Sequence, residues 1–215
     1  MRKRKTGICP EGAPVLIVCI SATLVFALLE WAIPALLGLI LFFFSLNFFR
    51  DPQRVIPDGE NIAVSPADGK VVRVGKDTDP FTGEERSVVC VFMNVFDVHV
   101  NRMPVAGTVQ GFKYVPGKFV NASLDKASRD NERCAMHIRE ENGDLWTVVQ
   151  IAGLVARRIV LWAETGDQLA RGDRYGMIKF GSRLDLYFPC GYDPLVQVGD
   201  KVLAGQSVLA KKQEN

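Results

Sequence analysis

Two long apolar stretches dominate the first fifty residues. Residues 13–29 contain 17 amino acids without a charge, and residues 32–49 contain 18 more. At about 1.5 Å per residue, each stretch would form a helix of about 26 Å, slightly shorter than a hydrocarbon core of about 30 Å. Glu30 and Pro34 lie around the junction, and proline disfavours a continuous helix. The pattern therefore predicts a hydrophobic helical hairpin with a break between its halves.

Basic residues flank this region on both sides. Arg2, Lys3, Arg4 and Lys5 precede it, and Arg50 follows it. Because positive flanks stay on the cytoplasmic side, both ends are predicted to be cytoplasmic. This fits a hairpin, or two helices lying in the membrane interface, better than a single crossing. A cleaved secretory signal is the alternative, but the apolar region continues without a small-residue cleavage site. We therefore expect residues 1–50 to anchor the chain to a membrane.

Beyond residue 50 the pattern changes to short apolar runs separated by Gly, Asp or Pro. Val, Ile and Phe are enriched and helical periodicity is weak, which predicts strands. The expected strands are residues 70–74, 87–93, 95–103, 107–115, 146–151, 158–161, 177–180, 184–188 and 202–209. Residues 51–215 are thus predicted to form a mainly β domain, a sandwich or partly open barrel. The end of the chain resembles the hairpins of barrel-sandwich hybrid domains, such as biotinyl and lipoyl carriers.

Charge and cysteine usage exclude several classes of function. Residues 1–50 contain five Lys/Arg against two acids, and the remaining residues contain 21 Lys/Arg against 22 Asp/Glu. A nearly neutral β domain lacks the cationic face that nucleic acid requires, so no nucleic-acid partner is expected. Five cysteines and two histidines are scattered without CxxC spacing. This inventory argues against a metal site and fits a reducing compartment.

The two histidines are the side chains that titrate near neutral pH without large tuning. Around His99, polar and apolar residues alternate, which would place Asp97, His99 and Asn101 on one face of a strand. A solvated sheet face is the alternative. His137 lies beside the charged turn at residues 140–143, and we expect it at the surface.

An aspartate in a turn is a further candidate. Asp68 precedes Gly69 at the start of a strand-length run, and an Asp-Gly pair there is typical of a bend. The functional alternative is that Asp68 orients a histidine, as the acid does in a Ser-His-Asp arrangement.

Gly181-Ser182 is the one Gly-Ser dipeptide in the chain. The carbonyl of a glycine is sterically open, so the Ser182 hydroxyl could attack it and shift the acyl group from nitrogen to oxygen. Elimination of that ester gives dehydroalanine, and hydrolysis leaves a pyruvoyl group on the new amino terminus. A glycine in a β-bulge, with a neighbouring serine, is the structural alternative.

Several motifs stand together in one order. They are Phe49-Arg50-Asp51-Pro52, Ser65-Pro66-Ala67-Asp68-Gly69-Lys70-Val71, Phe96-Asp97-Val98-His99-Val100-Asn101-Arg102-Met103-Pro104, Val115-Pro116-Gly117-Lys118-Phe119, Asn131-Glu132-Arg133, Gln150-Ile151-Ala152-Gly153-Leu154-Val155-Ala156-Arg157-Arg158-Ile159 and Phe180-Gly181-Ser182-Arg183. Over roughly residues 47–210 this order resembles phosphatidylserine decarboxylase in its short, archaeal-type form, found widely in bacteria. Any one of the motifs alone would be weak.

The resemblance implies self-processing. The family cleaves before the motif serine, here between Gly181 and Ser182, into a β chain of residues 1–181 and an α chain of residues 182–215. The cofactor would be a pyruvoyl group derived from Ser182, with neither metal nor pyridoxal phosphate. Asp68 would hold the imidazole of His99, which would take the hydroxyl proton of Ser182.

Two departures from the family pattern matter. The longer bacterial form usually has a second histidine three positions after the first, and Arg102 stands there in this chain. Any role of that second histidine does not transfer. The cleavage motif reads Phe-Gly-Ser-Arg instead of Leu-Gly-Ser-Thr, so the local strand packing around Arg183 stays open.

The implied reaction converts phosphatidylserine to phosphatidylethanolamine and CO2 through a Schiff base on the pyruvoyl group, a step of phospholipid biosynthesis. The enzyme would be a peripheral or monotopic protein of the cell (inner) membrane, with its catalytic domain on the cytoplasmic side. Its partners would be the bilayer and its own two chains as a heterodimer, and association of such heterodimers into a homo-oligomer stays open. In the polar loop at residues 116–133, Lys118 and Arg129 are candidates for binding the headgroup. An exposed connection is the alternative for this loop.

Three other functions fit parts of the sequence. A serine hydrolase would use the same Asp, His and Ser but would remain one chain. A barrel-sandwich carrier or membrane adaptor would need a lysine at a hairpin tip. A pyruvoyl decarboxylase of soluble amino acids would not need residues 13–49. The intact mass of the protein distinguishes most of these alternatives.

Overall fold

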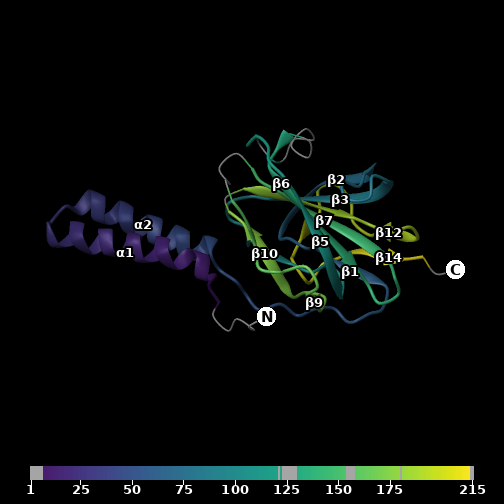
Figure 1. The fold of residues 1–215 in the computed structure, drawn as a ribbon. Helices are drawn as coiled ribbons and strands as arrows, with labels where there is room; N and C mark the ends of the chain where they lie inside the picture. Colours follow the sequence, from purple (N-terminus) through teal and green to yellow (C-terminus); the bar gives the residue numbers. More distant parts are fainter. Residues whose placement is uncertain (1–6, 121, 123–129, 154–157, 180, 214–215) are drawn as a thin grey trace. The chain divides into compact units, whose positions relative to one another are not determined.

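The chain folds into two compact units, an apolar helical unit and a larger β unit (Figure 1). The computed structural model describes residues 7–120, 122, 130–153, 158–179 and 181–213. The units comprise Met1–Gln53 and Arg54–Asn215. This boundary lies close to the change from long apolar stretches to strand-length runs.

The helical unit is a hairpin. A short 3-10 helix, η1 (Pro10–Gly12), leads into α1 (Ala13–Leu28), and α2 (Ala32–Phe48) returns beside it (Figure 1). Glu30, in the turn between them, has a φ of 60°. Gly38 allows the helices to approach closely, because a Cβ at this position would lie 2.5 Å from the Thr23 hydroxyl. The predicted helical hairpin, with its break at this junction, is confirmed.

The two ends of the hairpin are joined by backbone hydrogen bonds. The Cys9 amide donates to the Phe49 carbonyl at 2.7 Å, and the Asp51 amide donates to the Gly7 carbonyl at 2.7 Å. The start and the end of the hairpin therefore lie side by side.

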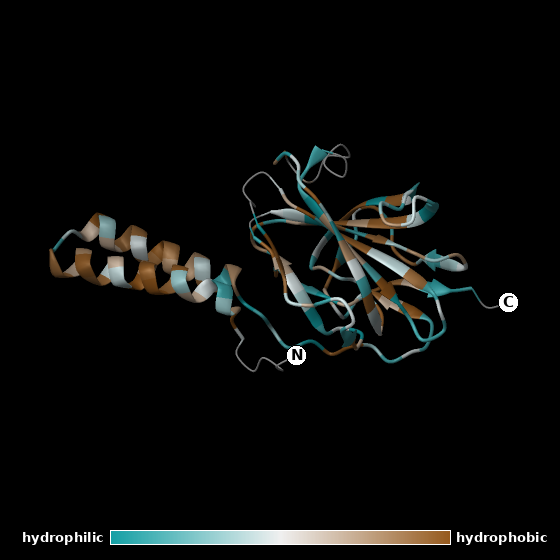
Figure 2. Cartoon of the chain, in the orientation of Figure 1, coloured by the Kyte–Doolittle hydropathy of each residue, from teal (hydrophilic) through white to brown (hydrophobic). Residues whose placement is uncertain are grey.

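Much of the hairpin is hydrophobic (Figure 2). Many of its large apolar side chains are exposed. Val18 is 67% exposed, Ile33 75% and Leu28 84%. Among the described residues, one helix, Pro10–Leu28, is long and apolar enough to cross a membrane, and Ala32–Phe48 is shorter. Isolated helices that are apolar on all sides are typical of contact with lipid or with another apolar partner.

The described part of the β unit consists of three antiparallel sheets. An eight-stranded sheet, curled into a half-barrel, has the order β13-β2-β3-β11-β7-β6-β5-β9, and two three-stranded sheets have the orders β1-β14-β12 and β4-β10-β8 (Figure 1). The strands are β1 (Ile62–Val64), β2 (Gly69–Thr78), β3 (Glu85–Met93), β4 (Val100–Arg102), β5 (Gly107–Val115), β6 (Arg133–Arg139), β7 (Leu145–Ile151), β8 (Ile159–Leu161), β9 (Gln168–Leu169), β10 (Arg174–Ile178), β11 (Ser182–Tyr187), β12 (Tyr192–Pro194), β13 (Lys201–Val202) and β14 (Val208–Lys212). The predicted fold class, a mainly β domain after a hydrophobic helical hairpin, is confirmed.

Alternation along the central strands separates two layers of side chains. Leu184 and Leu186 of β11 enter the large core together with Met93 of β3. The opposite face of the sheet packs a smaller cluster, Val88, Cys90, Ala135, Val149, Ile151 and Tyr187. Because successive residues of a strand point to opposite faces, Ser182 belongs to the large-core side and Arg183 to the other.

Several segments differ from the predicted strands. Within the predicted strand 202–209, residues 203–207 form a turn between β13 and β14, and β1, β9 and β12 lie outside the predicted ranges. Residues 95–103 form a turn followed by the short strand β4, because side chains satisfy the backbone of the turn. Asp97 Oδ2 accepts from the Asn94 amide at 2.8 Å, and Asn94 Oδ1 accepts from the Phe96 amide at 2.8 Å. β6, which follows the polar loop, is a strand that the hydrophobic pattern does not predict.

Candidate active site

Ser182 is the first residue of β11 and is fully buried. Strand pairing places it opposite Met93 of β3. The preceding Gly181 has a φ of 64°, in the left-handed region that favours glycine. Among the described residues, the Ser182 Oγ has no hydrogen-bond partner. Buried hydroxyls are nearly always bonded, so this unpartnered atom beside the Gly181 carbonyl marks a site of chemical interest.

His99 is also fully buried and contacts the residue before Ser182. Its Nδ1 lies 2.9 Å from the Asp97 carbonyl oxygen, and the Gly181 amide donates to its Nε2 at 3.3 Å. A carbonyl oxygen can only accept, so this pattern assigns the ring proton to Nδ1 and leaves Nε2 as the basic nitrogen. The geometry places a neutral base next to the Gly181-Ser182 dipeptide.

Asp68 is buried, but its contacts differ from the expected ones. Its Oδ2 accepts from Arg54 Nη2 at 2.6 Å, and its Oδ1 accepts from the Ala204 amide at 2.7 Å. Within the described part of the chain, neither oxygen contacts the imidazole of His99. The structure therefore does not bring the three predicted residues into one chain of hydrogen bonds. The physical reason is that the guanidinium offers Asp68 a charge-assisted bond, while the Asp97 carbonyl occupies Nδ1 of His99.

The carbonyl of Gly181 lies against the backbone of Gly153. A side chain at Gly153 would overlap the Gly181 carbonyl oxygen, and its Cβ would lie 3.5 Å from the Cβ of Ala122. Gly153 lies two residues beyond Ile151, the last residue of β7 that pairs with β11. The close approach leaves room for glycine alone.

Asn131 holds this region in place and is fully buried. Its Nδ2 donates to the carbonyls of Val120 at 2.8 Å and Ala152 at 2.7 Å, and its Oδ1 accepts from the Val120 amide at 3.0 Å. The side-chain amide of Asn131 thus connects Val120 of the polar loop to Ala152, the residue before Gly153. The Asn131-Glu132-Arg133 motif drew attention to this position without showing its contacts.

Two buried amides lie beside the Ser182–Met93 pair. Gln150 Nε2 donates to Asn101 Oδ1 at 2.8 Å, and Asn101 Nδ2 lies 3.8 Å from Met93 Sδ. The alternation around His99 predicts Asn101 on the same face of the strand. No sequence pattern assigns a role to Gln150. A single glutamine inside an apolar run has no chemical signal of its own, so only the fold could identify it.

Within the described residues, Lys118, one of the two predicted headgroup residues, makes no hydrogen bond to Ser182 or His99. Lys118 is exposed, and its backbone pairs with the segment around Asn131: the Lys118 amide donates to Asp130 at 2.7 Å, and the Glu132 amide donates to Lys118 at 3.0 Å. Arg129 lies outside the described residues.

His137 is buried, so the expectation of a surface position is wrong. It is 6% exposed, and its ring stacks on Phe81 with centroids 4.4 Å apart. Its Nδ1 lies 3.1 Å from Thr147 Oγ1, which donates to Asp79 at 2.8 Å. Burial lowers the pKa of His137, and the negative charge of Asp79 opposes this shift. The residue belongs to the layer opposite the large core, away from Ser182.

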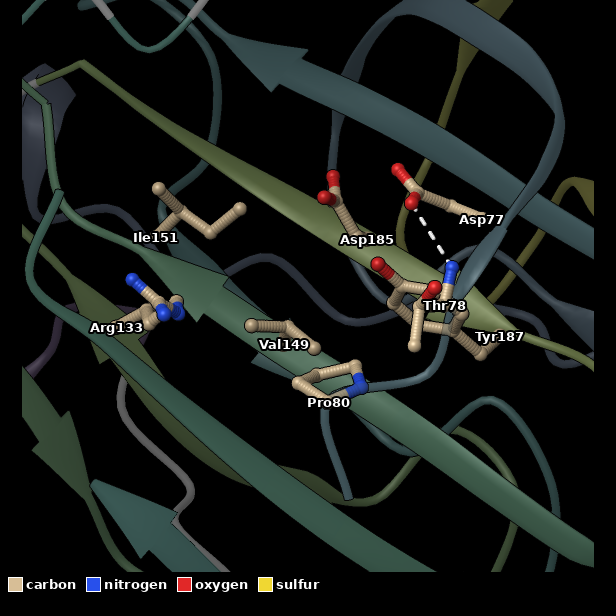
Figure 3. Close-up of a pocket in the computed structure, with 8 residues that line it drawn as sticks. All are labelled: Asp77, Thr78, Pro80, Arg133, Val149, Ile151, Asp185 and Tyr187. Carbon is tan, nitrogen blue, oxygen red and sulfur yellow. Dashed lines mark hydrogen bonds between the residues drawn. The ribbon is translucent and has the colours of Figure 1, made fainter. Parts of the chain in front are cut away.

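Two large pockets also lie away from Ser182 and His99. One, of about 330 Å³, is lined by Asp77, Thr78, Pro80, Arg133, Val149, Ile151, Asp185 and Tyr187 (Figure 3). Successive side chains of β11 point to opposite faces of the sheet, so Asp185 and Tyr187 face away from the side of Ser182. This pocket therefore opens on the opposite face. The other, of about 940 Å³, is bordered by residues 59–62, 106–108, 139–142 and 168–171.

The described residues contain no group of three or more His, Cys, Asp and Glu side chains that could hold a metal ion. The group that the motifs imply would be made from Ser182 itself. A buried Oγ without a partner, next to a glycine carbonyl, fits that origin.

Comparison with known proteins identifies the family. A sequence model described as phosphatidylserine decarboxylase matches residues 41–210. The chain is 58% identical over 212 residues to the phosphatidylserine decarboxylase proenzyme of Nitratidesulfovibrio vulgaris, which covers 99% of this chain and 98% of that protein. It is 58% identical over 214 residues to the proenzyme of Solidesulfovibrio magneticus, with 100% of both chains covered, and 56% identical over 214 residues to that of Oleidesulfovibrio alaskensis, with 100% and 98% covered. The family predicted from the motifs is thus confirmed: the chain belongs to the phosphatidylserine decarboxylases, which are lyases.

Proposed function

We propose that this chain is a proenzyme that cleaves itself between Gly181 and Ser182 and then converts phosphatidylserine to phosphatidylethanolamine and CO2 at a membrane surface. The main support is one observation. The Ser182 hydroxyl is buried without a partner among the described residues, beside a glycine whose amide donates to His99. The names of the relatives, phosphatidylserine decarboxylase proenzymes, support both the reaction and the precursor state.

In the self-cleavage, His99 exchanges the Gly181 amide for the Ser182 hydroxyl and accepts its proton at Nε2. The Ser182 Oγ attacks the Gly181 carbonyl carbon, the C–N bond breaks, and the proton passes to the freed nitrogen. The acyl group is then an ester on Oγ. Loss of the Ser182 Cα proton expels Gly181 as a carboxylate and leaves dehydroalanine. Addition of water and loss of ammonia convert residue 182 to a pyruvoyl group.

The surroundings of the Gly181 carbonyl support this step. Gly153 leaves its oxygen unobstructed by a side chain, and Asn131 fixes the neighbouring Ala152 carbonyl at 2.7 Å. Rigid placement of the reacting atoms accounts for much of the rate of intramolecular reactions.

Asp68 completes the proposed self-processing set. To orient His99, it has to exchange Arg54 for the imidazole, because both of its oxygens are engaged elsewhere. The Asp97 carbonyl already bonds Nδ1 of His99 at 2.9 Å. We therefore expect Asp68→Asn to slow the cleavage and His99→Ala to abolish it, with intact mass as the measurement.

In the decarboxylation, the pyruvoyl group supplies an electron sink for the carbanion that loss of CO2 produces. His99 is proposed to take up a proton at Nε2 and to donate it to the substrate's α carbon after CO2 has left. The amides of Asn101 and Gln150 keep the site polar without adding a charge. Lys118 and Arg129 are proposed to bind the phosphate of the headgroup.

Membrane association is proposed for the helical unit. Its helices are apolar on all sides, and one of them is long enough to span a bilayer. Withdrawing a lipid from a bilayer costs about 0.8 kcal/mol per CH2 group, so an anchored enzyme reaches its substrate more readily. Basic residues at both flanks support attachment to the cell (inner) membrane with the β unit on its cytoplasmic side.

The intact mass of the purified full-length protein tests this proposal. We expect two chains, residues 1–181 and 182–215, and an α chain that reacts with carbonyl reagents and has no free amino terminus. Ser182→Ala is expected to remain a single chain. A wild-type chain that is continuous through residue 181 and inert to carbonyl reagents would overturn the proposal. Labelling of Ser182 by a fluorophosphonate would then favour a serine hydrolase.

A further inference from the structure

A buried ion pair lies immediately after Ser182, on the opposite face of β11. Arg183 is fully buried, and Asp185 is 1% exposed. Arg183 Nε donates to Asp185 Oδ1 at 2.6 Å, and Arg183 Nη2 donates to Asp185 Oδ2 at 2.8 Å. This two-bond geometry is the most specific way in which a guanidinium and a carboxylate can pair.

The pair also contacts the neighbouring strand. Arg183 Nη2 donates to Cys90 Sγ at 3.2 Å, and Cys90 of β3 stands directly opposite Asp185 in the sheet. Burial raises the pKa of the Cys90 thiol, and the charge of Asp185 raises it further, so the thiol stays neutral. Burial alone would lower the pKa of Arg183, but the charge and hydrogen bonds of Asp185 raise it overall. Arg183 therefore stays charged and paired.

Stability alone does not explain such a pair. Apolar residues of similar volume usually replace a buried ion pair without loss of stability, because burying the charges costs about as much as their attraction returns. What the pair does offer is a fixed position for the backbone that bears it. That backbone adjoins the bond that the proposed function cleaves.

Cleavage would change the status of residue 182. It would lose its covalent connection to Gly181 and become a chain end, and chain ends fray unless they are held. In the described ladder, residue 182 pairs only with Met93, whereas Arg183 pairs with both Phe92 and Ile151. Arg183 is thus the first residue of the new end that is held from both sides.

We propose that the Arg183–Asp185 pair is a clamp that keeps the new end of the α chain in register and points residue 182 toward the large core. Both are positioning residues, because they act on the reacting group through the backbone of β11. The inference rests on the proposed function, since the chain end exists only after cleavage. It also assigns a role to Arg183, which replaces the threonine of the motif Leu-Gly-Ser-Thr.

The test compares Arg183→Thr and Arg183→Lys with wild type in the full-length protein on phosphatidylserine vesicles. Arg73→Thr is the matched control. It removes another Arg–Asp pair, Arg73 Nη1 to Asp77 Oδ2 at 2.6 Å. Its arginine is 31% exposed and lies on β2, which is separated from β11 by β3. The readouts are cleavage by intact mass, amide hydrogen exchange of residues 183–187 in the cleaved protein, and kcat and KM per reactive carbonyl.

For Arg183→Thr we expect faster exchange at the start of β11 and a kcat per carbonyl that is lower by about tenfold to hundredfold, with KM unchanged. Arg183→Lys should have exchange rates and a kcat per carbonyl between those of Arg183→Thr and wild type. The control Arg73→Thr should match wild type in both. A purely structural role would instead reduce the yield of folded protein and leave kcat per carbonyl unchanged.

A second variant keeps the test decisive if Arg183→Thr fails to fold. The double variant Arg183→Met with Asp185→Leu removes both charges together and leaves no unpaired ion in the core. Exchange and kcat per carbonyl equal to wild type in either folded variant would overturn the clamp. An uncleaved wild-type chain would instead overturn the proposed function.

Discussion

Gly181 and Gly153 are glycines for two different physical reasons. Gly181 has a φ of 64°, which disfavours other residues, although no atom lies within 4 Å of its Cβ position. Gly153 has no positive φ, but the Gly181 carbonyl fills the place that a side chain would need. The first glycine shapes the backbone before Ser182, and the second leaves space beside the bond that we propose is cleaved.

Gly153→Ala is therefore expected to slow the self-cleavage by about a hundredfold, because an added methyl group has to displace the Gly181 carbonyl from its position. The measurement is the fraction of cleaved chain over time, by intact mass. Gly75→Ala in β2 is the control, since no atom lies within 4 Å of its Cβ position. Equal cleavage rates for the two variants would show that the contact is unimportant.

His137 gives the fold a pH dependence that is separate from catalysis. Because burial lowers its pKa below the usual 6.5, the unfolded chain binds a proton more readily than the folded protein does. The contribution of His137 to the free energy of unfolding should be fully present above pH 6.5. It should be lost as the pH falls from 6.5 toward the lower pKa of the folded protein, by about 1.4 kcal/mol per unit of pKa difference. Urea denaturation at several pH values measures this. His137→Gln should have a flatter profile, and an unchanged slope would assign the effect to other groups.

Among the elements, the helical hairpin and β11 differ in what surrounds them. The hairpin exposes large apolar side chains along α1 and α2. β11 is instead enclosed on both edges, between β3 and β7 of the largest sheet. The exposed apolar element is suited to a membrane, and the enclosed strand is suited to hold a reacting group still.

Val18→Lys is expected to weaken binding to phospholipid vesicles by about a hundredfold, because a lysine near the centre of a membrane helix costs about 3 kcal/mol. Val18 is 67% exposed in α1, and Val55→Lys is the control, since Val55 is 81% exposed in the β unit. Vesicle flotation measures the binding. Self-cleavage should be unaffected in both variants. Unchanged flotation of Val18→Lys would contradict the proposed anchor.

For the whole molecule, the proposed cleavage divides two of the three described sheets between two chains. The α chain would contain β11, which lies between β3 and β7, and β14, which lies between β1 and β12. Two further contacts would join the chains: the Ala204 amide donates to Asp68 at 2.7 Å, and Arg54 donates to Gln206 at 3.0 Å. The fold therefore supports a cleaved protein that keeps its shape.

We expect the two chains to elute together in native size-exclusion chromatography and to separate only in denaturant. The physical reason is that removing the α chain would expose strand edges and the large core at once. Native and denaturing mass spectrometry of the same sample make the comparison. Release of the α chain under native conditions would show that strand pairing does not hold it.

The sequence by itself determined the features that depend on neighbouring residues. The apolar stretches are long and uncharged, so the helices and their break at Glu30 followed from hydrophobicity and length. The strand at residues 107–115 followed in the same way and is β5. The Gly181-Ser182 chemistry is also local, because the two reacting groups belong to adjacent residues. The order of the motifs sufficed for the family.

The tertiary structure alone decided which distant groups meet. Asp68 pairs with Arg54 and Ala204, His137 is buried against Phe81, and Arg183 pairs with Asp185 beside Cys90. Hydrophobic periodicity describes which face of an element is buried, but it does not say which charges and amides will oppose one another there. Those partners depend on the register and order of strands far apart in the chain, and only the tertiary structure specifies these.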